Sequence, residues 1–273
     1  MENVRNIVIL TGAGVSAESG LATFRGPDGL WEGHRVEDVA TPEAYARDPA
    51  LVHQFYDARR ARLHEVEPNA AHVALARLDA EWPGRLLIVT QNVDDLHERA
   101  GAKRLLHMHG DLTSGWCLAC DERFSWEGPM SPFTDCLEPG AGLPLSADSH
   151  QEGQSFDKLR TNGNVCPVCS TPGQVRPDIV WFGEMPYEMD RIDAALMACD
   201  LFVSIGTSGA VYPAAGFVQT ARYCGAKTLE INLEPSQGSI FFDERRYGPA
   251  GVEVPKWVHE ILAQSAQSSP MSL

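Results

Sequence analysis

Four short runs of apolar residues constrain the fold of this chain more than any other feature of its sequence. Each is too short for a typical buried helix and passes directly into a polar or glycine-rich stretch, as buried parallel strands do where they enter loops. The four predicted strands are Ile7–Leu10, Leu86–Thr90, Leu201–Ile205 and Thr228–Leu233.

Helical patterns lie between or after these runs. They cover Pro68–Trp82, Val93–Ala100, Met189–Cys199 and Pro255–Ala263. Strands that alternate with helices predict an α/β fold built on a Rossmann-like, doubly wound parallel sheet. Ligands bind such sheets outside the carboxyl ends of the strands, so the loops after the four runs are the candidate site.

Two stretches interrupt the alternation, and the length of 273 residues suits one large domain carrying a smaller one. We expect a single domain over residues 1–263. Its Rossmann-like part covers about 1–32, 68–113 and 175–263, its helical insertion about 33–67, and its cysteine-bearing insertion about 114–174. The serine-rich residues 264–273 are expected to form a mobile tail.

Composition excludes several classes of protein. Hydrophobic residues make up 44% of the chain and charged residues 22%, which is typical of a globular protein. No apolar run approaches the roughly 18 residues of a membrane helix, and Ile7–Leu10 is too short for a secretory signal, so we expect a cytoplasmic protein. A net charge of −15 argues against direct binding of nucleic acid.

Four of the seven cysteines form two C-x-x-C pairs, Cys117 with Cys120 and Cys166 with Cys169. Two such thiolate pairs complete a tetrahedral S₄ site, which suits structural zinc. Two unrelated pairs of buried thiols are the alternative. The 45 residues between the pairs exceed the roughly 15 to 20 of an ordinary zinc ribbon, so a substitute ligand, Cys136 or His150, stays open.

The first predicted strand runs into a glycine loop, Gly12-Ala13-Gly14-Val15-Ser16-Ala17. Glycines at a strand-to-helix turn let backbone N–H groups approach a pyrophosphate. A glycine turn without a ligand satisfies the pattern equally well, because the acidic residue expected about 20 positions later is missing. A turn-rich loop, Thr23–Trp31, stands there instead.

Residues Gly12–Gly20, followed by Phe24-Arg25-Gly26, resemble the opening signature of the sirtuins, which are NAD-dependent protein-lysine deacylases. Further motifs agree in the family's order: Thr90–His97, His109-Gly110, the two cysteine pairs, Gly206–Ser208 and Asn232–Glu234. The match covers roughly residues 5–262 and is strongest to the bacterial class III enzymes. It implies one structural Zn²⁺ on the four paired cysteines, and NAD as a co-substrate that is cleaved while the acyl group passes to ADP-ribose.

The resemblance also implies which residues contact NAD. They are Gly12, Ala13, Gly14, Ser16, Ala17, Glu18, Phe24, Arg25, Trp31, Gln91, Asn92, Asp94, Gly206, Thr207, Ser208, Asn232, Glu234 and Ala250. Asn92 and Asp94 would hold the nicotinamide end, Gln91 the nearby ribose, and Asn232 or Glu234 the adenosine ribose. From the residues alone, Asn92 and Asp94 serve equally well as caps of the following helix.

Two histidines, His107 and His109, lie two positions apart and share a face if the segment is extended. Nothing local ranks one above the other. The resemblance selects His109 as the general base, because it precedes a glycine, and leaves His107 as structural. An imidazole with a pKa near neutrality accepts a proton at cellular pH.

Arg176–Glu184 is predicted to be a short strand with an exposed edge, and an ordinary strand within a sheet is the alternative. The resemblance implies that one part of it binds an extended substrate peptide as an added strand. That part comprises Val180, Trp181, Phe182, Gly183 and Glu184.

Tyr56 and Arg59, at positions i and i+3 of a predicted helix, share a face on which a phenol and a guanidinium could clamp a carboxylate. A solvated basic helix with Arg60 and Arg62 is the alternative. By resemblance to class III sirtuins this pair holds the end of the acyl chain, and Ala40 is the small residue that widens the pocket. We therefore expect the protein to remove succinyl and malonyl groups from lysines, with glutaryl as a further candidate. Acetyl groups should be removed as well.

Two other functions stay open. One is a non-catalytic module whose glycine loop binds a nucleotide while its zinc ribbon binds a nucleic acid or a protein. The other is an ADP-ribosyltransferase that uses the same cleavage of NAD with a protein nucleophile. The expected partners are acylated-lysine proteins or peptides, and the sequence leaves the oligomeric state open.

Overall fold

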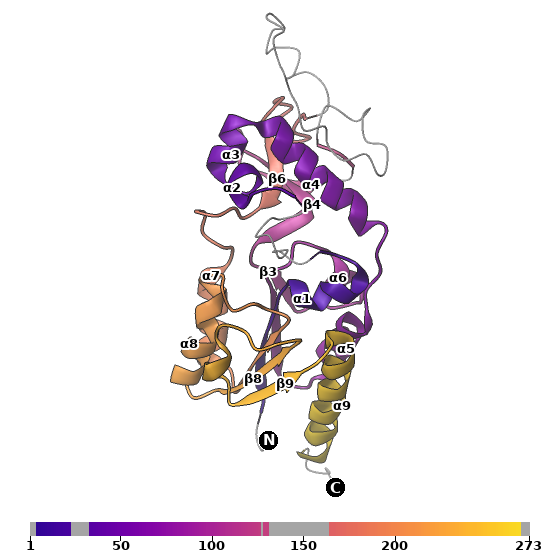
Figure 1. Cartoon of the computed structure of the whole chain (residues 1–273), viewed down its shortest axis with the longest axis vertical. Coiled ribbons are helices and arrows are strands. Elements are labelled where there is room, and N and C mark those ends of the chain that lie inside the picture. The colour runs from indigo at the N-terminus through magenta and orange to yellow at the C-terminus, as the bar shows by residue number, and fades with distance from the viewer. Residues whose placement is uncertain (1–3, 23–32, 127, 131–163, 269–273) are drawn as a thin grey trace, which may run out of the picture.

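The computed structural model describes residues 4–22, 33–126, 128–130 and 164–268 (Figure 1). Its larger part is a six-stranded sheet in the order β3-β2-β1-β7-β8-β9, in which every neighbouring pair is parallel. The strands are β1 Asn6–Thr11, β2 Arg85–Thr90, β3 Leu105–His107, β7 Leu201–Ile205, β8 Lys227–Asn232 and β9 Glu244–Tyr247. The order reverses at β1, which confirms the doubly wound sheet.

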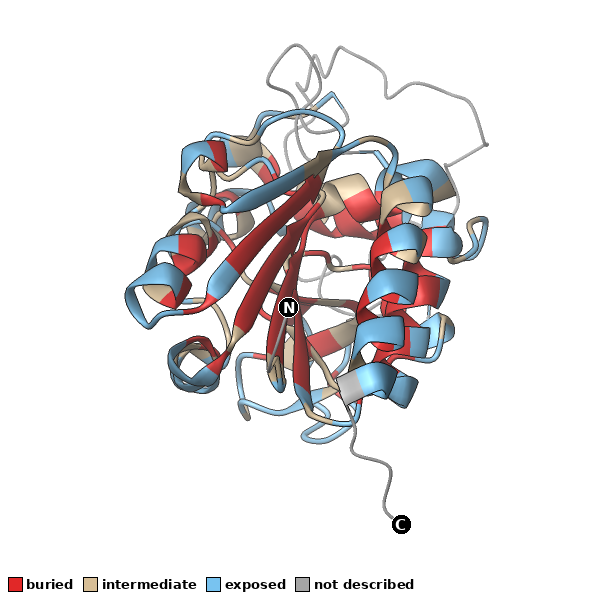
Figure 2. Cartoon of the chain, turned by 90° about the horizontal axis from the view of Figure 1, so that it is seen from below, coloured by how far each residue is buried: buried red, intermediate tan, exposed pale blue. Residues whose placement is uncertain are grey.

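The central strands are buried on both faces. In β1, Ile7 and Ile9 point into one hydrophobic cluster, while Val8 and Leu10 point into another. Successive side chains of a strand face opposite ways, so one apolar run supplies both cores. Figure 2 shows the buried strands between two sets of helices.

One core packs under helices α5 and α9, and the other under α7 and α8. The helices of this part are α1 Ala13–Ser16, α5 Ala70–Glu81, α6 Leu96–Arg99, α7 Met189–Ala198, α8 Phe217–Tyr223 and α9 Ala250–Ser268. Short 3₁₀ turns cover Ala17–Ser19, Ala214–Gly216 and Ser239–Phe241. None of the helices in the described ranges is long and apolar enough to span a membrane.

A smaller unit stands beyond the carboxyl ends of the sheet strands (Figure 1). It comprises the helices α2 Val36–Val39, α3 Pro42–Arg47 and α4 Pro49–Leu63, and the strands β4 Gly110–Cys117, β5 Arg123–Ser125 and β6 Val175–Ile179. The strands form an antiparallel sheet in the order β5-β4-β6. Side-chain caps begin two of the helices, because Thr41 accepts the Ala44 N–H and Asp48 accepts the Leu51 N–H.

Some predicted bounds are wrong. Helix α9 begins at Ala250 and ends at Ser268, so the predicted tail is helical over residues 264–268, while residues 269–273 lie outside the described residues. Helix α6 begins only at Leu96, because the Asp94 side chain accepts the Leu96 N–H and turns the chain before the helix. Strand β6 ends at Ile179, so the predicted strand Arg176–Glu184 does not continue through its second half.

A buried ion pair joins helix α4 to the antiparallel sheet. Arg60 Nη1 lies 2.6 Å from Asp57 Oδ1, and the two side chains are 4% and 8% exposed. Arg60 Nε also donates to the Leu112 carbonyl of β4, and Asp57 accepts the Met130 N–H. The pair therefore fixes helix α4, which carries Tyr56 and Arg59, against that sheet.

We expect Arg60→Met to lower the free energy of unfolding by about 3–5 kcal/mol, because it leaves the buried Asp57 charge without its guanidinium. Chemical denaturation followed by circular dichroism measures the change. Arg77→Met is the matched control, since Arg77 forms an exposed pair with Glu81 and its loss should leave stability unchanged. Equal effects of the two substitutions would contradict the role of the buried pair.

Candidate active site

Two glycine loops cross at the carboxyl edge of the parallel sheet. Gly12 N–H donates to the Ile205 carbonyl at 3.0 Å, and Gly14 N–H donates to the Gly206 carbonyl at 2.8 Å. A Cβ on Gly206, whose φ is +63°, would lie 2.5 Å from the backbone N of Val15. The two backbones therefore touch where no side chain fits, and they form one floor that presents main-chain groups to a ligand.

Beside this floor lies a buried polar group of three side chains, Ser16, Asn92 and Asp94. The Asn92 amide donates to the Gly12 carbonyl at 3.2 Å and to Ser16 Oγ at 3.0 Å, while the Ser16 hydroxyl donates to Asp94 Oδ2 at 3.0 Å. Burial raises the pKa of Asp94 to about 6, although hydrogen bonds from Ser16 and from the Leu96 N–H oppose the shift. The Asp94 carboxylate is thus the acceptor of this group near neutral pH.

His109 follows β3 and faces the same region. Its Nδ1 lies 3.2 Å from the Gln91 carbonyl oxygen, which can only accept, so Nδ1 carries the proton and Nε2 is the basic nitrogen. Burial lowers the pKa of His109, and the bond to Gln91 opposes that shift. Gly110 follows with a φ of +84°, and a Cβ there would overlap the Asp178 carbonyl, which explains the His-Gly sequence.

His107 has a different environment. Its Nε2 lies 2.6 Å from Glu98 Oε1 and its Nδ1 lies 3.0 Å from the Asn92 carbonyl oxygen. Burial lowers the pKa of His107, but the bonds to Glu98 and Asn92 outweigh it and raise the pKa above the ordinary value. Both nitrogens are engaged with acceptors, so His107 ties the loop after β2 to helix α6, in keeping with the structural role predicted for it.

A cleft of about 980 Å³ joins these features. It runs between the edge of the parallel sheet and the smaller unit, and every predicted site residue in the described ranges, apart from the four cysteines, lines it. Phe24, Arg25 and Trp31 lie outside the described residues. The cleft is also lined by apolar residues that sequence reasoning missed, because they carry no motif: Leu21, Ala22, Leu63, Leu112 and Pro186. Val93, within the motif Thr90–His97, lines it as well.

At the far end of the cleft, several predicted residues hold loops together. Asn232 Nδ2 donates to the Thr207 carbonyl at 2.7 Å, and Glu18 Oε1 accepts the Gly251 N–H at 2.9 Å. The buried Glu230 carboxylate accepts the Ser236 N–H and the Ser239 hydroxyl, which fixes the loop after β8. Glu230 is a residue that the sequence reading missed, since a buried carboxylate inside an apolar strand gives no motif.

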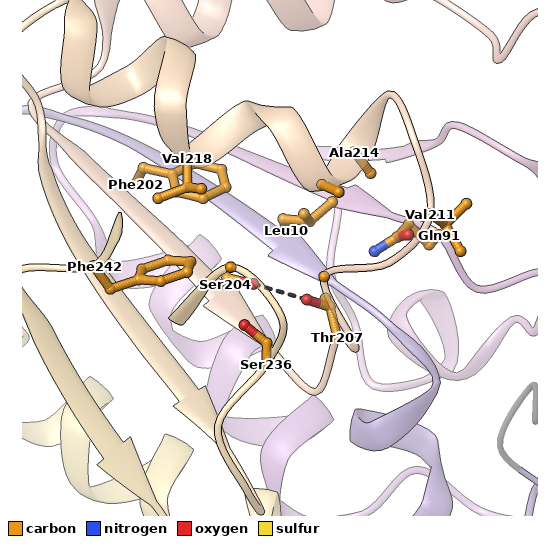
Figure 3. A pocket seen from close by; sticks show the side chains of 13 residues that line it. Leu10, Gln91, Phe202, Ser204, Thr207, Val211, Ala214, Val218, Ser236 and Phe242 are labelled. Atoms are coloured by element: carbon orange, nitrogen blue, oxygen red, sulfur yellow. Dashed lines mark hydrogen bonds between the residues drawn. The ribbon is translucent and has the colours of Figure 1, made fainter. Parts of the chain in front are cut away.

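A second cavity of about 20 Å³ lies beneath the loop after β7 and shares four lining residues with the large cleft: Gln91, Thr207, Val211 and Ser236. Figure 3 shows its apolar wall of Leu10, Phe202 and Val218 and the 3.0 Å hydrogen bond between Ser204 and Thr207. This volume holds about one water molecule. The cavity is thus too small for any part of a nucleotide, and the large cleft is the candidate site.

Tyr56 and Arg59 of helix α4 lie side by side on the cleft, as their spacing predicts. The Tyr56 oxygen accepts the Trp181 Nε1–H at 3.0 Å, and burial raises the pKa of Tyr56, so the phenol is neutral. Arg59 stacks its guanidinium 3.5 Å above the Phe55 ring and donates to the Phe55 carbonyl. Both side chains are almost completely buried, which excludes the solvated basic helix as their environment.

The segment Val180–Glu184 lines the cleft as a turn and not as an open strand edge. Val180 N–H donates to the His109 carbonyl, Trp181 N–H to the Glu184 carboxylate, and Phe182 N–H to the Ala40 carbonyl. Arg176 holds Glu184 in place at 2.6 Å. The Glu184 N–H donates to the Trp181 carbonyl, so four of the five N–H groups are engaged. Among the contacts of the described residues, this leaves the Gly183 N–H and the Val180 and Gly183 carbonyl groups for a bound peptide.

The four paired cysteines meet in the smaller unit, with all their sulfur atoms within 4.8 Å of one another. Cys117 and Cys169 are 3.7 Å apart, and Cys120 and Cys166 are 3.8 Å apart. A tetrahedron with zinc–sulfur bonds of about 2.3 Å has sulfur–sulfur edges of about 3.8 Å, so the four thiolates fit a structural Zn²⁺. Cys136 and His150 lie outside the described residues.

We expect the purified protein to contain one zinc per chain, as measured by inductively coupled plasma mass spectrometry. Cys117→Ser should lose that zinc and lower the melting temperature, because the ligand set is incomplete. Cys224→Ser removes an exposed thiol outside the cluster and should retain the metal. A wild-type chain that folds fully without zinc would contradict the assignment.

Comparison with known proteins places this arrangement in a family. Residues 12–213 match the Sir2 family. The NAD-dependent protein deacylase of Vibrio parahaemolyticus is 52% identical over 95% of this chain and 96% of its own length, and that of Bdellovibrio bacteriovorus is 53% identical over 94% and 97%. A crystal structure of a Sir2 homologue in complex with NAD, 34% identical, superposes with a TM-score of 0.76 over 96% of this chain and 91% of its own. The chain belongs to the Sir2 family.

Proposed function

We propose that this chain is an NAD-dependent protein-lysine deacylase that uses NAD as a co-substrate. The observation that carries the proposal is the single cleft in which the crossed glycine loops, the Asn92–Asp94 group and His109 meet. The names of the relatives, NAD-dependent protein deacylases at about half identity over nearly the whole chain, support the same activity.

The cleft residues suit the two ends of a dinucleotide. Both N–H groups of the Asn92 amide bind the protein, which leaves its carbonyl oxygen and the Asp94 carboxylate for a nicotinamide carboxamide. Gln91 would bind the nearby ribose. The loops at Gly206–Ser208, Asn232–Glu234 and Ala250 would hold the adenosine half, and Phe24, Arg25 and Trp31 complete the proposed site.

Bound NAD supplies a labile glycosidic bond and a ribose that receives the acyl group. For that transfer, a ribose hydroxyl must lose a proton. His109 Nε2 is the group that would take it, because Nδ1 is held protonated by the Gln91 carbonyl. The lowered pKa of His109 keeps the imidazole neutral, and therefore basic, at neutral pH. The products would be nicotinamide, O-acyl-ADP-ribose and free lysine.

We further propose that the enzyme prefers acyl groups that end in a carboxylate, namely succinyl, malonyl and glutaryl. The Trp181 Nε1–H occupies one lone pair of the Tyr56 oxygen, which orients the phenol beside the Arg59 guanidinium. A buried guanidinium and a neutral phenol on one face suit a carboxylate, and acetyl would still fit the same space. Ala40 lines the same cleft, and its small side chain would accommodate the longer acyl chain.

Acylated-lysine proteins or peptides are the proposed partners, and the cytoplasm is the proposed location. A reducing compartment keeps cysteines as free thiols, which a four-thiolate zinc site requires. The Val180 and Gly183 carbonyl groups and the Gly183 N–H would bind the main chain of a peptide. Main-chain contacts of this kind select little among peptide sequences.

The main test incubates the protein with NAD and a panel of succinyl-, malonyl-, glutaryl- and acetyl-lysine peptides, followed by mass spectrometry of the products. We expect nicotinamide and O-acyl-ADP-ribose from the wild type. His109→Ala should lower the rate by about 10² to 10⁴, because the general base is lost. Near-normal turnover by that variant would exclude His109 as the base, and ADP-ribose retained on protein would favour an ADP-ribosyltransferase.

Tyr56→Phe and Arg59→Met should lower desuccinylation by about ten- to a hundredfold each, because each removes a hydrogen bond to a charged acyl end. Deacetylation by the same variants is the internal control and should change much less, since an acetyl group has no carboxylate. Competition assays with paired succinyl and acetyl peptides measure the ratio directly. A parallel loss on both substrates would show that the two residues support the fold of the pocket and not its selectivity.

A further inference from the structure

Glu230 is a buried carboxylate in strand β8 that belongs to none of the motifs discussed above and has no part in the proposed reaction. Its side chain is 1% exposed. The neighbouring Leu229 and Ile231 point into the hydrophobic cluster under helices α5 and α9, so Glu230 points to the opposite face of the sheet. Burial of a carboxylate is unfavourable unless hydrogen bonds replace its water, so its contacts indicate what it does.

Three donors from three different segments meet this carboxylate. Oε1 accepts the Ser236 backbone N–H at 3.1 Å, while Oε2 accepts the Ser239 hydroxyl at 2.6 Å and the Tyr247 hydroxyl at 3.2 Å. The two hydroxyl oxygens lie 2.8 Å from each other. Glu230 thus joins the loop after β8, the 3₁₀ turn that follows this loop, and the edge strand β9.

The loop held in this way forms one wall of the cleft, since residues 232–237 all line it. Two main-chain bonds fix its second half. Ser236 N–H donates to Glu230, and Gln237 N–H donates to the Ser208 carbonyl of the loop after β7 at 3.0 Å. The three residues before Ser236 are exposed to solvent, so their path along the cleft depends on these anchors.

We propose that Glu230 is a positioning residue for the adenosine end of the cleft, because its carboxylate holds the loop that forms this wall. The inference rests on the proposed function, in which Gly206–Ser208, Asn232–Glu234 and Ala250 hold the adenosine half of NAD. Glu230 is not among the residues that line the cleft, so it acts on the ligand only through the loop. The glycosidic bond lies at the other end of the ligand, so a loosened loop weakens binding of NAD without slowing the chemistry.

Two variants of similar length separate the hydrogen bonds of Glu230 from its bulk. Glu230→Met fills the same space but leaves the Ser236 N–H without its acceptor. Glu230→Gln keeps a carbonyl oxygen for that N–H, and the Ser239 hydroxyl can rotate to accept from the new amide. We expect Glu230→Met to raise KM for NAD about tenfold and Glu230→Gln to stay within about threefold of the wild type. In both variants kcat and KM for the acylated peptide should stay unchanged.

Asp79→Asn is the control for a general loss of stability. Asp79 is also a buried carboxylate that accepts main-chain N–H groups, those of Lys103 and Arg104, but it does not line the cleft. Its substitution should lower the melting temperature and leave KM for NAD unchanged. An equal rise of KM in Asp79→Asn and Glu230→Met would mean that Glu230 only supports the fold, and a wild-type KM in Glu230→Met would overturn the proposal outright.

The main-chain bond can be measured in the wild type. In ¹⁵N-serine-labelled protein, hydrogen exchange should find the Ser236 amide protected, and its signal is identified by its loss in Ser236→Ala. Rapid exchange of that amide would overturn the proposal even if Glu230→Met failed to fold. Absence of NAD cleavage by the wild type would instead contradict the proposed function, while hydrogen exchange would still report on the bond to Glu230.

Discussion

Direct contact between two backbones, where the loop after β1 meets the loop after β7, is the constraint on which the cleft depends. Gly14 donates to the Gly206 carbonyl, and a side chain on either glycine would collide with the other loop. Because β1 and β7 are parallel neighbours in the sheet, the loops that follow them begin side by side at its carboxyl edge. The contact places main-chain groups, with no intervening side chain, at the base of the cleft.

The opposite wall comes from the smaller unit, whose own elements are tied to one another by two ion pairs. The Asp57–Arg60 pair ties helix α4 to β4, and the Arg176–Glu184 pair holds the turn after β6. Trp181 then joins the two, because its indole donates to Tyr56 while its backbone N–H donates to Glu184. The wall that would meet an acyl chain is thus a connected set of bonds and not a collection of separate side chains.

The sequence predicted most accurately those elements whose residue pattern is set by a single physical effect, such as burial on both faces. Leu201–Ile205 is found with the predicted bounds, because a strand buried on both faces leaves a continuous apolar run. Strand β9, Glu244–Tyr247, was missed, since an edge strand of charged and exposed residues lacks that signal. Local pattern did not separate His109 from His107; resemblance to a family did. Glu230 could not have been found, because its role depends on partners that are brought close only by the fold.

Three side chains around the cleft are each fixed by a hydrogen bond to a main-chain group. The bond determines either which ring nitrogen is protonated or how the amide is oriented. The Gln91 carbonyl sets the protonated nitrogen of His109, the Asn69 N–H sets that of His72, and the Gly12 carbonyl sets the orientation of the Asn92 amide. Main-chain groups do not titrate and cannot exchange donor for acceptor. Side chains are therefore held in fixed states where they contact ordered main chain. Here the loops after the neighbouring strands β1 and β2 supply two of these main-chain groups, and the N-cap of helix α5 supplies the third.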